Sequence, residues 1–268
     1  YLQPAPALQP YVSTYIFLQS WEAEEVQSVP PHLASGLAFL WGEGTVWHGQ
    51  VEETLPSSNV IPINDEPFSV KGSPGSRALS VKFRPGQFSA FFGWPQDLFF
   101  DQTIPLADTD IGADFQLLHE SLNEQPSAQA MGQVLDRFLL DHLPQRPAFR
   151  PLMNWVLEQL LQDAGPTQLQ QLWPRVKVTE RHLRRLFRES TGLSRRQFVR
   201  ILRFYRAFSL LLSGQYTSQA QLALDAGYFD QAHFVRDFRT YAGQTPTAFL
   251  TRHQELAVHL GWEGWREG

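Results

Sequence analysis

The N-terminal part of the chain is built of short apolar runs separated by turn-forming residues. Over about the first 110 residues, runs such as 37–41, 60–63 and 78–83 stand between segments rich in Pro and Gly. Apolar runs of this length with such boundaries are typical of β-strands. The pattern predicts a mainly β region.

The hydrophobic period then changes from that of strands to that of helices. Beyond residue 114, apolar residues recur every three or four positions, with Pro126 between two groups: Phe115, Leu118, Leu122, and then Met131, Val134, Leu135, Phe138 and Leu139. This spacing places them on one face of a helix, and proline interrupts helices. Two helices, 115–122 and 130–140, are therefore expected.

The C-terminal part has helical periodicity throughout. We expect an amphipathic helix over 152–161, a short helix over 168–173 that stops at Pro174, and a helix that Thr179 caps and that runs to about Thr191. Residues 196–212 predict a longer helix of about 25 Å, which would act as a rigid spacer. Its expected apolar stripe is Ile201, Tyr205, Phe208 and Leu212.

A pattern of apolar and basic residues occurs twice, 51 positions apart. Thr179, His182, Leu183, Arg185, Phe187, Arg188, Gly192 and Phe198 correspond to Asp230, His233, Phe234, Arg236, Phe238, Arg239, Gly243 and Phe249. The second copy also has a helix pattern over 219–226, followed by Gly227 and the capping residue Asp230, which indicates a helix-turn-helix unit. In the first copy, residues 174–177 stand where a glycine is expected, so that unit is inferred from the repeat.

Charge is distributed unevenly along the 268 residues. Residues 1–149 carry 6 Lys and Arg against 17 Asp and Glu, residues 150–253 carry 15 against 7, and the tail carries 1 against 3, which gives the net charge of −5. The charge reverses near the helix-resistant segment 144–147. We expect an N-terminal domain over 1–145, a basic domain over 146–253 and a tail over 254–268.

The exposed faces of the duplicated helices suit recognition of DNA bases. Arginine can hydrogen-bond guanine in two places, glutamine does the same with adenine, and an alanine methyl can contact thymine. The expected DNA-binding residues of the first helix are Arg181, Arg184, Arg185 and Arg188, and those of the second are Gln231, Ala232, His233 and Arg236. An arginine face alone is usually only a solvated surface, but its duplication after a short helix and turn favours DNA binding.

These residues also carry a family resemblance. Residues 178–188 (VTERHLRRLFR) and 191–194 (TGLS), and then 226–239 (AGYFDQAHFVRDFR) and 243–246 (GQTP), closely resemble the two halves of an AraC/XylS-type DNA-binding domain. The resemblance covers about residues 152–252 and implies two helix-turn-helix units joined by a long helix. The sequence departs from the family pattern at Trp173 and Pro174, where a small residue and continued helix are usual.

A shorter resemblance concerns the N-terminal region. Residues 29–32 (VPPH) and 81–86 (VKFRPG) are similar to a domain fused to some AraC-type regulators. The wider family implies a small β-barrel that senses an effector or drives dimerisation. The expected fold is thus α+β, with a barrel-like domain and two helices followed by an all-α domain. Helices 115–122 and 130–140 are the candidates for a homodimer contact, although such a stripe is more often internal core.

A small-molecule effector would be held by aromatic walls and a few polar groups. By residue type the candidates are Trp41, Trp47, His48, Phe83 and Arg84, although an aromatic residue at strand spacing usually belongs to the core. His32 and His48 could suggest a metal, but no His-x-His or His-Glu-x-x-His pattern is present. We expect no metal and no cofactor.

The chemistry of the chain argues against an enzyme. It contains no cysteine, which removes the nucleophile of alkyl-transfer repair proteins that share such a DNA-binding module. No Gly-x-Ser-x-Gly, Walker or dinucleotide motif occurs either. No secretory signal or membrane-length apolar segment is visible, so a cytoplasmic protein without membrane contact is expected.

The expected function is transcriptional regulation through double-stranded DNA, with an effector, RNA polymerase and a second copy of the chain as further partners. One alternative is a constitutive architectural DNA-binding protein whose N-terminal domain is purely structural. The other is an enzyme domain fused to the DNA-binding module.

Overall fold

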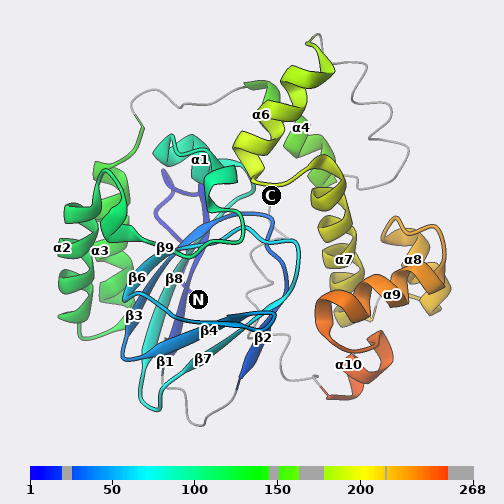
Figure 1. The fold of residues 1–268 in the computed structure, drawn as a ribbon, viewed down its shortest axis with the longest axis horizontal. Helices are drawn as coiled ribbons and strands as arrows, with labels where there is room; N and C mark the ends of the chain where they lie inside the picture. The colour runs from blue at the N-terminus through cyan, green and yellow to red at the C-terminus, as the bar shows by residue number, and fades with distance from the viewer. Residues whose placement is uncertain (20–25, 145–150, 163–177, 215, 253–268) are drawn as a thin grey trace.

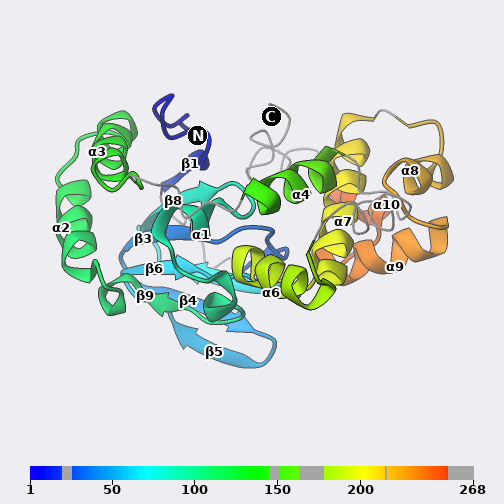
Figure 2. The same ribbon diagram turned by 90° about the horizontal axis from the view of Figure 1, so that it is seen from above.

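The protein has an N-terminal β domain and a C-terminal helical domain (Figure 1). The computed structural model describes residues 1–19, 26–144, 151–162, 178–214 and 216–252. The sheets and the helices α2 and α3 lie on one side of the molecule, and α7 to α10 lie on the other (Figures 1 and 2). The α+β fold expected from the sequence is confirmed. The boundary segment 145–150 and the tail 254–268 lie outside the described residues.

The β domain consists of two antiparallel sheets that face each other. One sheet has the strand order β1-β8-β3-β6-β9 and the other the order β2-β7-β4-β5. The strands are β1 (Val12–Gln19), β2 (Gln27–Val29), β3 (Gly36–Trp41), β4 (Gly44–His48), β5 (Val51–Thr54), β6 (Ser58–Ile61), β7 (Phe68–Gly72), β8 (Arg77–Phe83) and β9 (Ile104–Pro105). The apolar runs 37–41, 60–63 and 78–83 thus correspond to β3, β6 and β8, as predicted.

One face of the five-stranded sheet is covered by helices. These are α1 (Gln87–Phe92), α2 (Gly112–Asn123) and α3 (Ala128–Asp141), with the short 3-10 helices η1 (Gln96–Phe99) and η2 (Leu106–Asp108). Leu79, Val81 and Phe83 of β8 form part of the buried core on this face. Residues alternate across a strand, so Ala78, Ser80 and Lys82 point toward the second sheet.

The two predicted helices of the N-terminal domain form, and their stripes are internal. Phe115, Leu118 and Leu122 of α2 and Met131, Leu135 and Leu139 of α3 are buried in the same core as the sheet. The Tyr15 hydroxyl donates to Asp136 Oδ1 at 2.7 Å, which attaches α3 to β1. Leu117, which is 65% exposed, lies on the outer face of α2.

The C-terminal domain is helical. Its described helices are α4 (Pro151–Gln162), α6 (Glu180–Thr191), α7 (Arg195–Ser213), α8 (Gln219–Asp225), α9 (Gln231–Ala242) and α10 (Pro246–Arg252). Helices α4, α6, α7, α8 and α9 match helices predicted from the hydrophobic period and capping residues, whereas α10 was not predicted. The expected helix 168–173 lies outside the described residues. No described helix is long and apolar enough to cross a membrane.

The long helix α7 is more deeply buried than its sequence pattern predicts. Ile201 and Phe208 are buried as expected, but Tyr205 and Leu212 are only partly buried. Phe198, Val199, Leu202, Phe204, Ala207 and Leu211 are also buried. A single stripe was the wrong expectation because α7 packs against α6 on one side and α8, α9 and α10 on others. Helix α7 is therefore a central core element of the domain as well as the connection between the two units.

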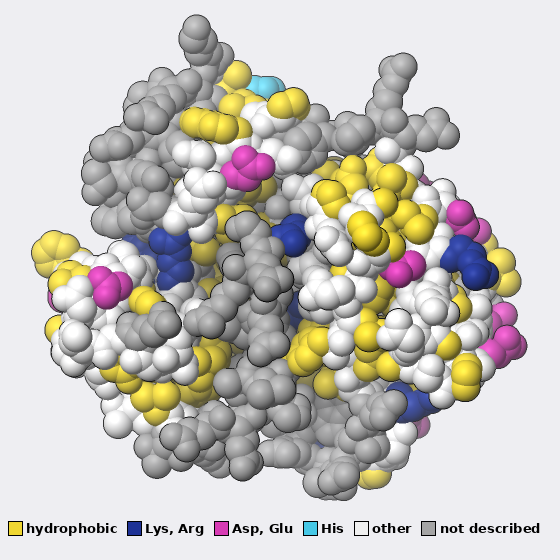
Figure 3. Space-filling model, turned by 180° about the vertical axis from the view of Figure 1, so that it is seen from behind, with side chains coloured by type: hydrophobic (Ala, Val, Ile, Leu, Met, Phe, Trp, Pro, Cys, Tyr) yellow, Lys and Arg dark blue, Asp and Glu magenta, His cyan; other side chains and the backbone are white. Residues whose placement is uncertain are grey.

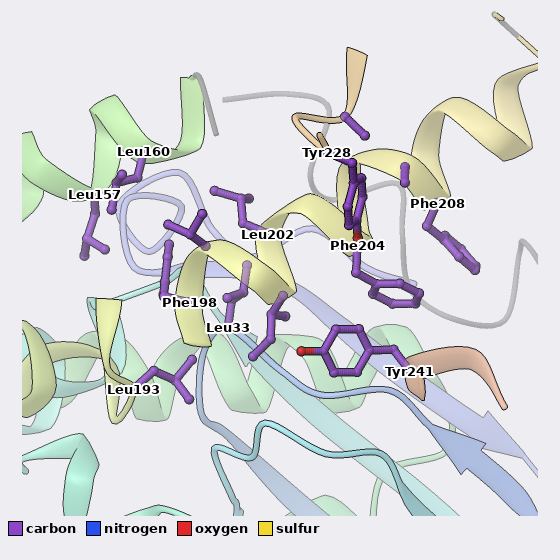
Figure 4. Packing of buried hydrophobic residues seen from close by; sticks show 14 of the residues in the cluster. Leu33, Leu157, Leu160, Leu193, Phe198, Leu202, Phe204, Phe208, Tyr228 and Tyr241 are labelled. Atoms are coloured by element: carbon purple, nitrogen blue, oxygen red, sulfur yellow. The ribbon is translucent and has the colours of Figure 1, made fainter. Parts of the chain in front are cut away.

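The two domains share part of one hydrophobic core. Leu33 and Ile63 of the N-terminal domain belong to the buried cluster built around α7 (Figure 4). The Tyr205 hydroxyl donates to the carbonyl oxygen of Pro31 at 2.6 Å, and Gln197 Nε2 donates to Asp65 Oδ2 at 2.7 Å. These contacts hold α7 against the loops at the end of the β domain.

Candidate nucleic-acid interface

Helices α8 and α9 form a helix-turn-helix unit. Gly227, between them, has a φ of 87°, a conformation that glycine adopts without the steric cost of a side chain. The Tyr228 amide donates to the Ala223 carbonyl oxygen at 2.8 Å and closes the turn. Asp230 caps α9 by accepting the His233 amide at 2.7 Å, as the sequence predicts.

Helix α6 repeats the features of α9. Thr179 caps it by accepting the His182 amide at 3.3 Å. Gly192 ends it with a φ of 71°, the same value as Gly243 at the end of α9. Segment 163–177, which would contain the first helix and the turn of this unit, lies outside the described residues.

The predicted arginines of α6 all lie on its exposed face. Two of them form ion pairs within the helix, since Arg184 contacts Glu180 at 2.5 Å and Arg185 contacts Glu189 at 2.7 Å. These pairs are solvent-exposed, so each contributes only about 0–1 kcal/mol and leaves the arginine able to exchange partners. Arg181 and Arg188 are exposed, and no ion pair joins them to another described residue.

Three of the four predicted residues on α9 are exposed. Gln231, Ala232 and Arg236 face solvent, and Gln231 Nε2 donates to Gln219 Oε1 of α8 at 3.1 Å. His233 is only half-exposed, with its ring 5.1 Å from that of Tyr228. Its Nε2 lies 3.5 Å from Asp237 Oδ2. The structure therefore places His233 at the edge of the interface.

A polar contact that the sequence analysis did not find holds α9 on α7. Arg200 of α7 donates to Asp237 Oδ1 from Nε at 3.2 Å and from Nη2 at 3.0 Å, and its guanidinium lies 5.1 Å from the Tyr241 ring. Burial raises the pKa of Tyr228 beside this pair. In the sequence, Asp237 directly follows Arg236 of the repeated basic pattern. The pattern itself does not indicate that Asp237 is buried.

Phe229 is a second residue that the sequence analysis did not single out. Its side chain is 88% exposed, although it directly precedes the Asp230 cap of α9. Val178 occupies the equivalent position before α6 and is also exposed, at 38%. The 51-residue repeat would have paired these two apolar residues. Both stand at the end of a recognition helix where apolar contact with a thymine methyl is feasible.

The predicted effector residues do not come together. Phe83 lies in the core under the helices, and Trp41 stacks on His119 of α2 at 5.1 Å. Arg84 Nε donates to the Gln9 carbonyl oxygen at 2.8 Å. Trp47 and His48 are neighbours on β4 and therefore point to opposite faces of its sheet. Of the five, His48 faces the space between the sheets, where it stacks on Phe68.

No metal site is present among the residues that the structure describes. In these ranges, no three His, Asp or Glu side chains lie together in a way that could hold an ion.

The fold and the exposed helices define a two-domain protein whose C-terminal half contains a helix-turn-helix DNA-binding domain. Residues 174–252 match a family described as a helix-turn-helix domain, and residues 1–105 match one described as a domain of unknown function (DUF6597). The match to a helix-turn-helix family agrees with the AraC-type pattern that residues 178–246 resemble.

Curated relatives include regulatory proteins of bacteria. The chain is 23% identical over 185 residues to the Msm operon regulatory protein of Streptococcus mutans, covering 66% of this chain and 65% of that protein. It is 29% identical over 136 residues to the HTH-type transcriptional regulator NimR of Escherichia coli, covering 47% and 48%. The matches therefore span less than two thirds of these relatives.

A solved structure has a similar fold over most of the chain. ToxT from Vibrio cholerae superposes with a TM-score of 0.50 at 12% identity, covering 88% of this chain and 98% of ToxT. The likeness supports the arrangement of an N-terminal β domain followed by helix-turn-helix units.

Proposed function

We propose that the protein is a sequence-specific DNA-binding transcriptional regulator. The observation that carries this proposal is the pair of equivalent helices, α6 and α9, each capped at its N-terminus and each presenting exposed arginines. An α-helix fits the major groove, and its N-terminal residues contact base edges. Arg181, Arg184 and Arg185 of α6, and Gln231, Ala232 and Arg236 of α9, are the proposed reading residues.

The joined helices imply an asymmetric DNA site. Successive major grooves on one face of DNA lie about 34 Å apart, so one chain would read two segments about one helical turn from each other. Arg188 and the half-buried His233 would then serve mainly at the sugar-phosphate backbone, which receives half to two-thirds of protein-DNA hydrogen bonds. The basic 150–253 segment supplies the accompanying attraction to phosphate.

The N-terminal domain is the proposed effector and dimerisation unit. The structure of ToxT that resembles this chain was solved with a bound carboxylic acid, (E)-4-(8-methylnaphthalen-1-yl)but-3-enoic acid. We place an effector between the two sheets, and a homodimer contact on the outer faces of α2 and α3, where Leu117 is exposed. RNA polymerase is a further partner of such a regulator, which would act in the bacterial cytoplasm.

Selection from a random DNA pool tests the proposed function. The bound fraction of the pool is sequenced, and binding is titrated over a series of salt concentrations. We expect enrichment of one asymmetric motif with two blocks about 10 base pairs apart. Binding without enrichment, with a steep loss of affinity in salt, would instead support the architectural alternative.

Arg236→Ala tests the assignment of the reading face. We expect this substitution to weaken binding to the selected site by about 1–3 kcal/mol, because it removes a base contact. Its effect on the free energy of unfolding should be small, since Arg236 is exposed. Arg77→Ala on β8 of the N-terminal domain, also exposed, is the matched control and should leave DNA affinity unchanged. A loss of stability comparable to that of a core variant would show that Arg236 faces inward.

A further inference from the structure

Some of the side chains that point from the five-stranded sheet toward the second sheet are not fully packed, although Thr14, Ile16 and Leu40 on the same face are buried. Along β8, the residues on the helix-covered face, Leu79, Val81 and Phe83, are buried, whereas Ala78, Ser80 and Lys82 keep exposed surface. Protein interiors are normally close-packed, so partial exposure at three successive inward positions indicates an accessible space. Figure 3 shows the molecule from behind, with a few Lys and Arg side chains visible near the middle of this face.

Lys82 places a cation without a partner in this space. No hydrogen bond or ion pair joins its ammonium group to any residue that the structure describes, although its backbone carbonyl oxygen accepts from Ser13. Burial lowers the pKa of Lys82 to about 8. The strand neighbours of Lys82 are Thr14 on β1 and Gly36 on β3. Desolvated cations in proteins are normally paired with anions.

Two histidines and several apolar side chains also line the space between the sheets. Phe68 of the second sheet lies 5.7 Å from the ring of His32 and 5.5 Å from that of His48. Burial, and to a smaller extent the charge of Lys82, lowers the pKa of His32 to about 3, so this ring is neutral. His48 Nε2 is buried and has no hydrogen-bond partner among the described residues. The buried apolar residues on the facing sides of the two sheets include Ile16, Leu40, Val46 and Phe68.

We propose that the space between the two sheets binds a small organic carboxylate, with the Lys82 ammonium group pairing with its carboxylate. His48 Nε2 offers a further hydrogen bond, and the apolar walls hold the hydrocarbon body. An ammonium-carboxylate pair satisfies both groups, and a charge-assisted hydrogen bond is about twice as strong as a neutral one. The inference rests on the proposed regulatory function and names the chemical class of its effector.

The position of the site connects it to the DNA-binding domain. His32 lies between Pro31, which accepts the Tyr205 hydroxyl, and Leu33, which is buried in the core around α7. A ligand beside His32 and Lys82 therefore touches the segment that holds α7. Its binding free energy can shift the equilibrium between arrangements of α7 if it favours one of them.

Binding of matched charged and neutral compounds tests the proposal on the full chain. The probes are octanoate and 4-phenylbutyrate, each compared with its amide, with tryptophan emission and the melting temperature as readouts. We expect the carboxylates to bind at least about tenfold more tightly than the amides, equivalent to about 1.4 kcal/mol. In Lys82→Met, the ratio of the affinities for the acid and its amide should fall to about one. Lys71, on β7, lies on the opposite face of that strand from Phe68, so Lys71→Met should keep the ratio of the unchanged protein.

The outcomes separate this proposal from the proposed function. Equal binding of acid and amide, a preference that persists in Lys82→Met, or no saturable binding of either carboxylate overturns the carboxylate site. The DNA selection is run on the same preparations. Specific DNA binding without a carboxylate preference overturns the site alone, and a carboxylate preference without specific DNA binding overturns the regulatory function alone.

Discussion

At the scale of single residues, the charged side chain of Lys82 destabilises the folded protein. A lysine that loses water without gaining a partner is destabilised in its charged form, and its pKa falls because the neutral form is favoured. The pKa of Lys82 is lowered to about 8 for this reason. A destabilising residue with no partner in the described part of the chain is typical of a binding site, where function is kept at the expense of stability.

Lys82→Met should therefore stabilise the free protein at pH 7. Below pH 8 the lysine is charged in both the folded and the unfolded chain, so the full cost applies, and we expect a gain of roughly 2 kcal/mol on its removal. Between pH 8 and about 10.4 the folded chain releases the proton first, so the gain shrinks, and above that range it should be nearly absent. Urea unfolding at pH 7 and pH 10.5 measures this. A loss of stability at pH 7 would contradict it, and Lys71→Met is the control.

At the scale of elements, the duplicated units differ in what surrounds them. Gly192 and Gly243 end α6 and α9 in the same left-handed conformation, at φ 71°. Nothing lies within 4 Å of a Cβ added at Gly243, whereas one at Gly192 would meet the Gln96 carbonyl oxygen at 3.0 Å and Ile63 Cγ2 at 3.1 Å. Helix α6 is thus docked against η1 and α1 of the N-terminal domain, whereas no described atom crowds the corresponding position at the end of α9.

Alanine substitution of the two glycines should distinguish two losses of unfolding free energy. One comes from the left-handed backbone conformation, and the other from crowding against the N-terminal domain. Gly243→Ala should lower the free energy of unfolding by about 1 kcal/mol, the cost of a side chain in this conformation. Gly192→Ala carries the same cost and in addition about 1–2 kcal/mol for the crowded contact with the N-terminal domain. Denaturant unfolding of both variants measures the difference. Equal losses of unfolding free energy in the two variants would mean that α6 is not held by the N-terminal domain in solution.

At the scale of the whole molecule, the shared core makes the two domains depend on each other. Leu33 and Ile63, which are 3% and 0% exposed, come from loops of the β domain but pack with the residues around α7. The hydrogen bonds from Tyr205 to Pro31 and from Gln197 to Asp65 add polar contacts at the same place. A structural change in one domain can therefore alter the other domain through α7.

Leu33→Ala tests this dependence through hydrogen exchange. Removing a buried leucine costs about 2–5 kcal/mol, and we expect the amides of α7 to lose protection although the substitution is in the other domain. Leu117→Ala, in which an exposed leucine of α2 is truncated, should leave α7 unaffected. Unchanged protection of α7 in Leu33→Ala would show that the domains open independently.

Much of the fold and part of the candidate interface could be predicted from the sequence. The strands β3, β6 and β8, the helices α2, α3, α6 and α9, and the caps at Thr179 and Asp230 all follow from periodicity and capping, which act over a few neighbouring residues. The exposed arginines of α6 followed from the same helical period. The extra buried faces of α7 did not, because its neighbours come from both domains.

The sequence by itself determined the elements, the 51-residue duplication and the basic character of the C-terminal domain, since these depend on local hydrogen bonding and on residue type. Only the tertiary structure decided that Lys82 has no partner among the described residues, that Asp237 is buried against Arg200, and that Leu33 belongs to the core around α7. Each of these depends on segments far apart in the chain being brought together, and no local pattern specifies which residues then become neighbours.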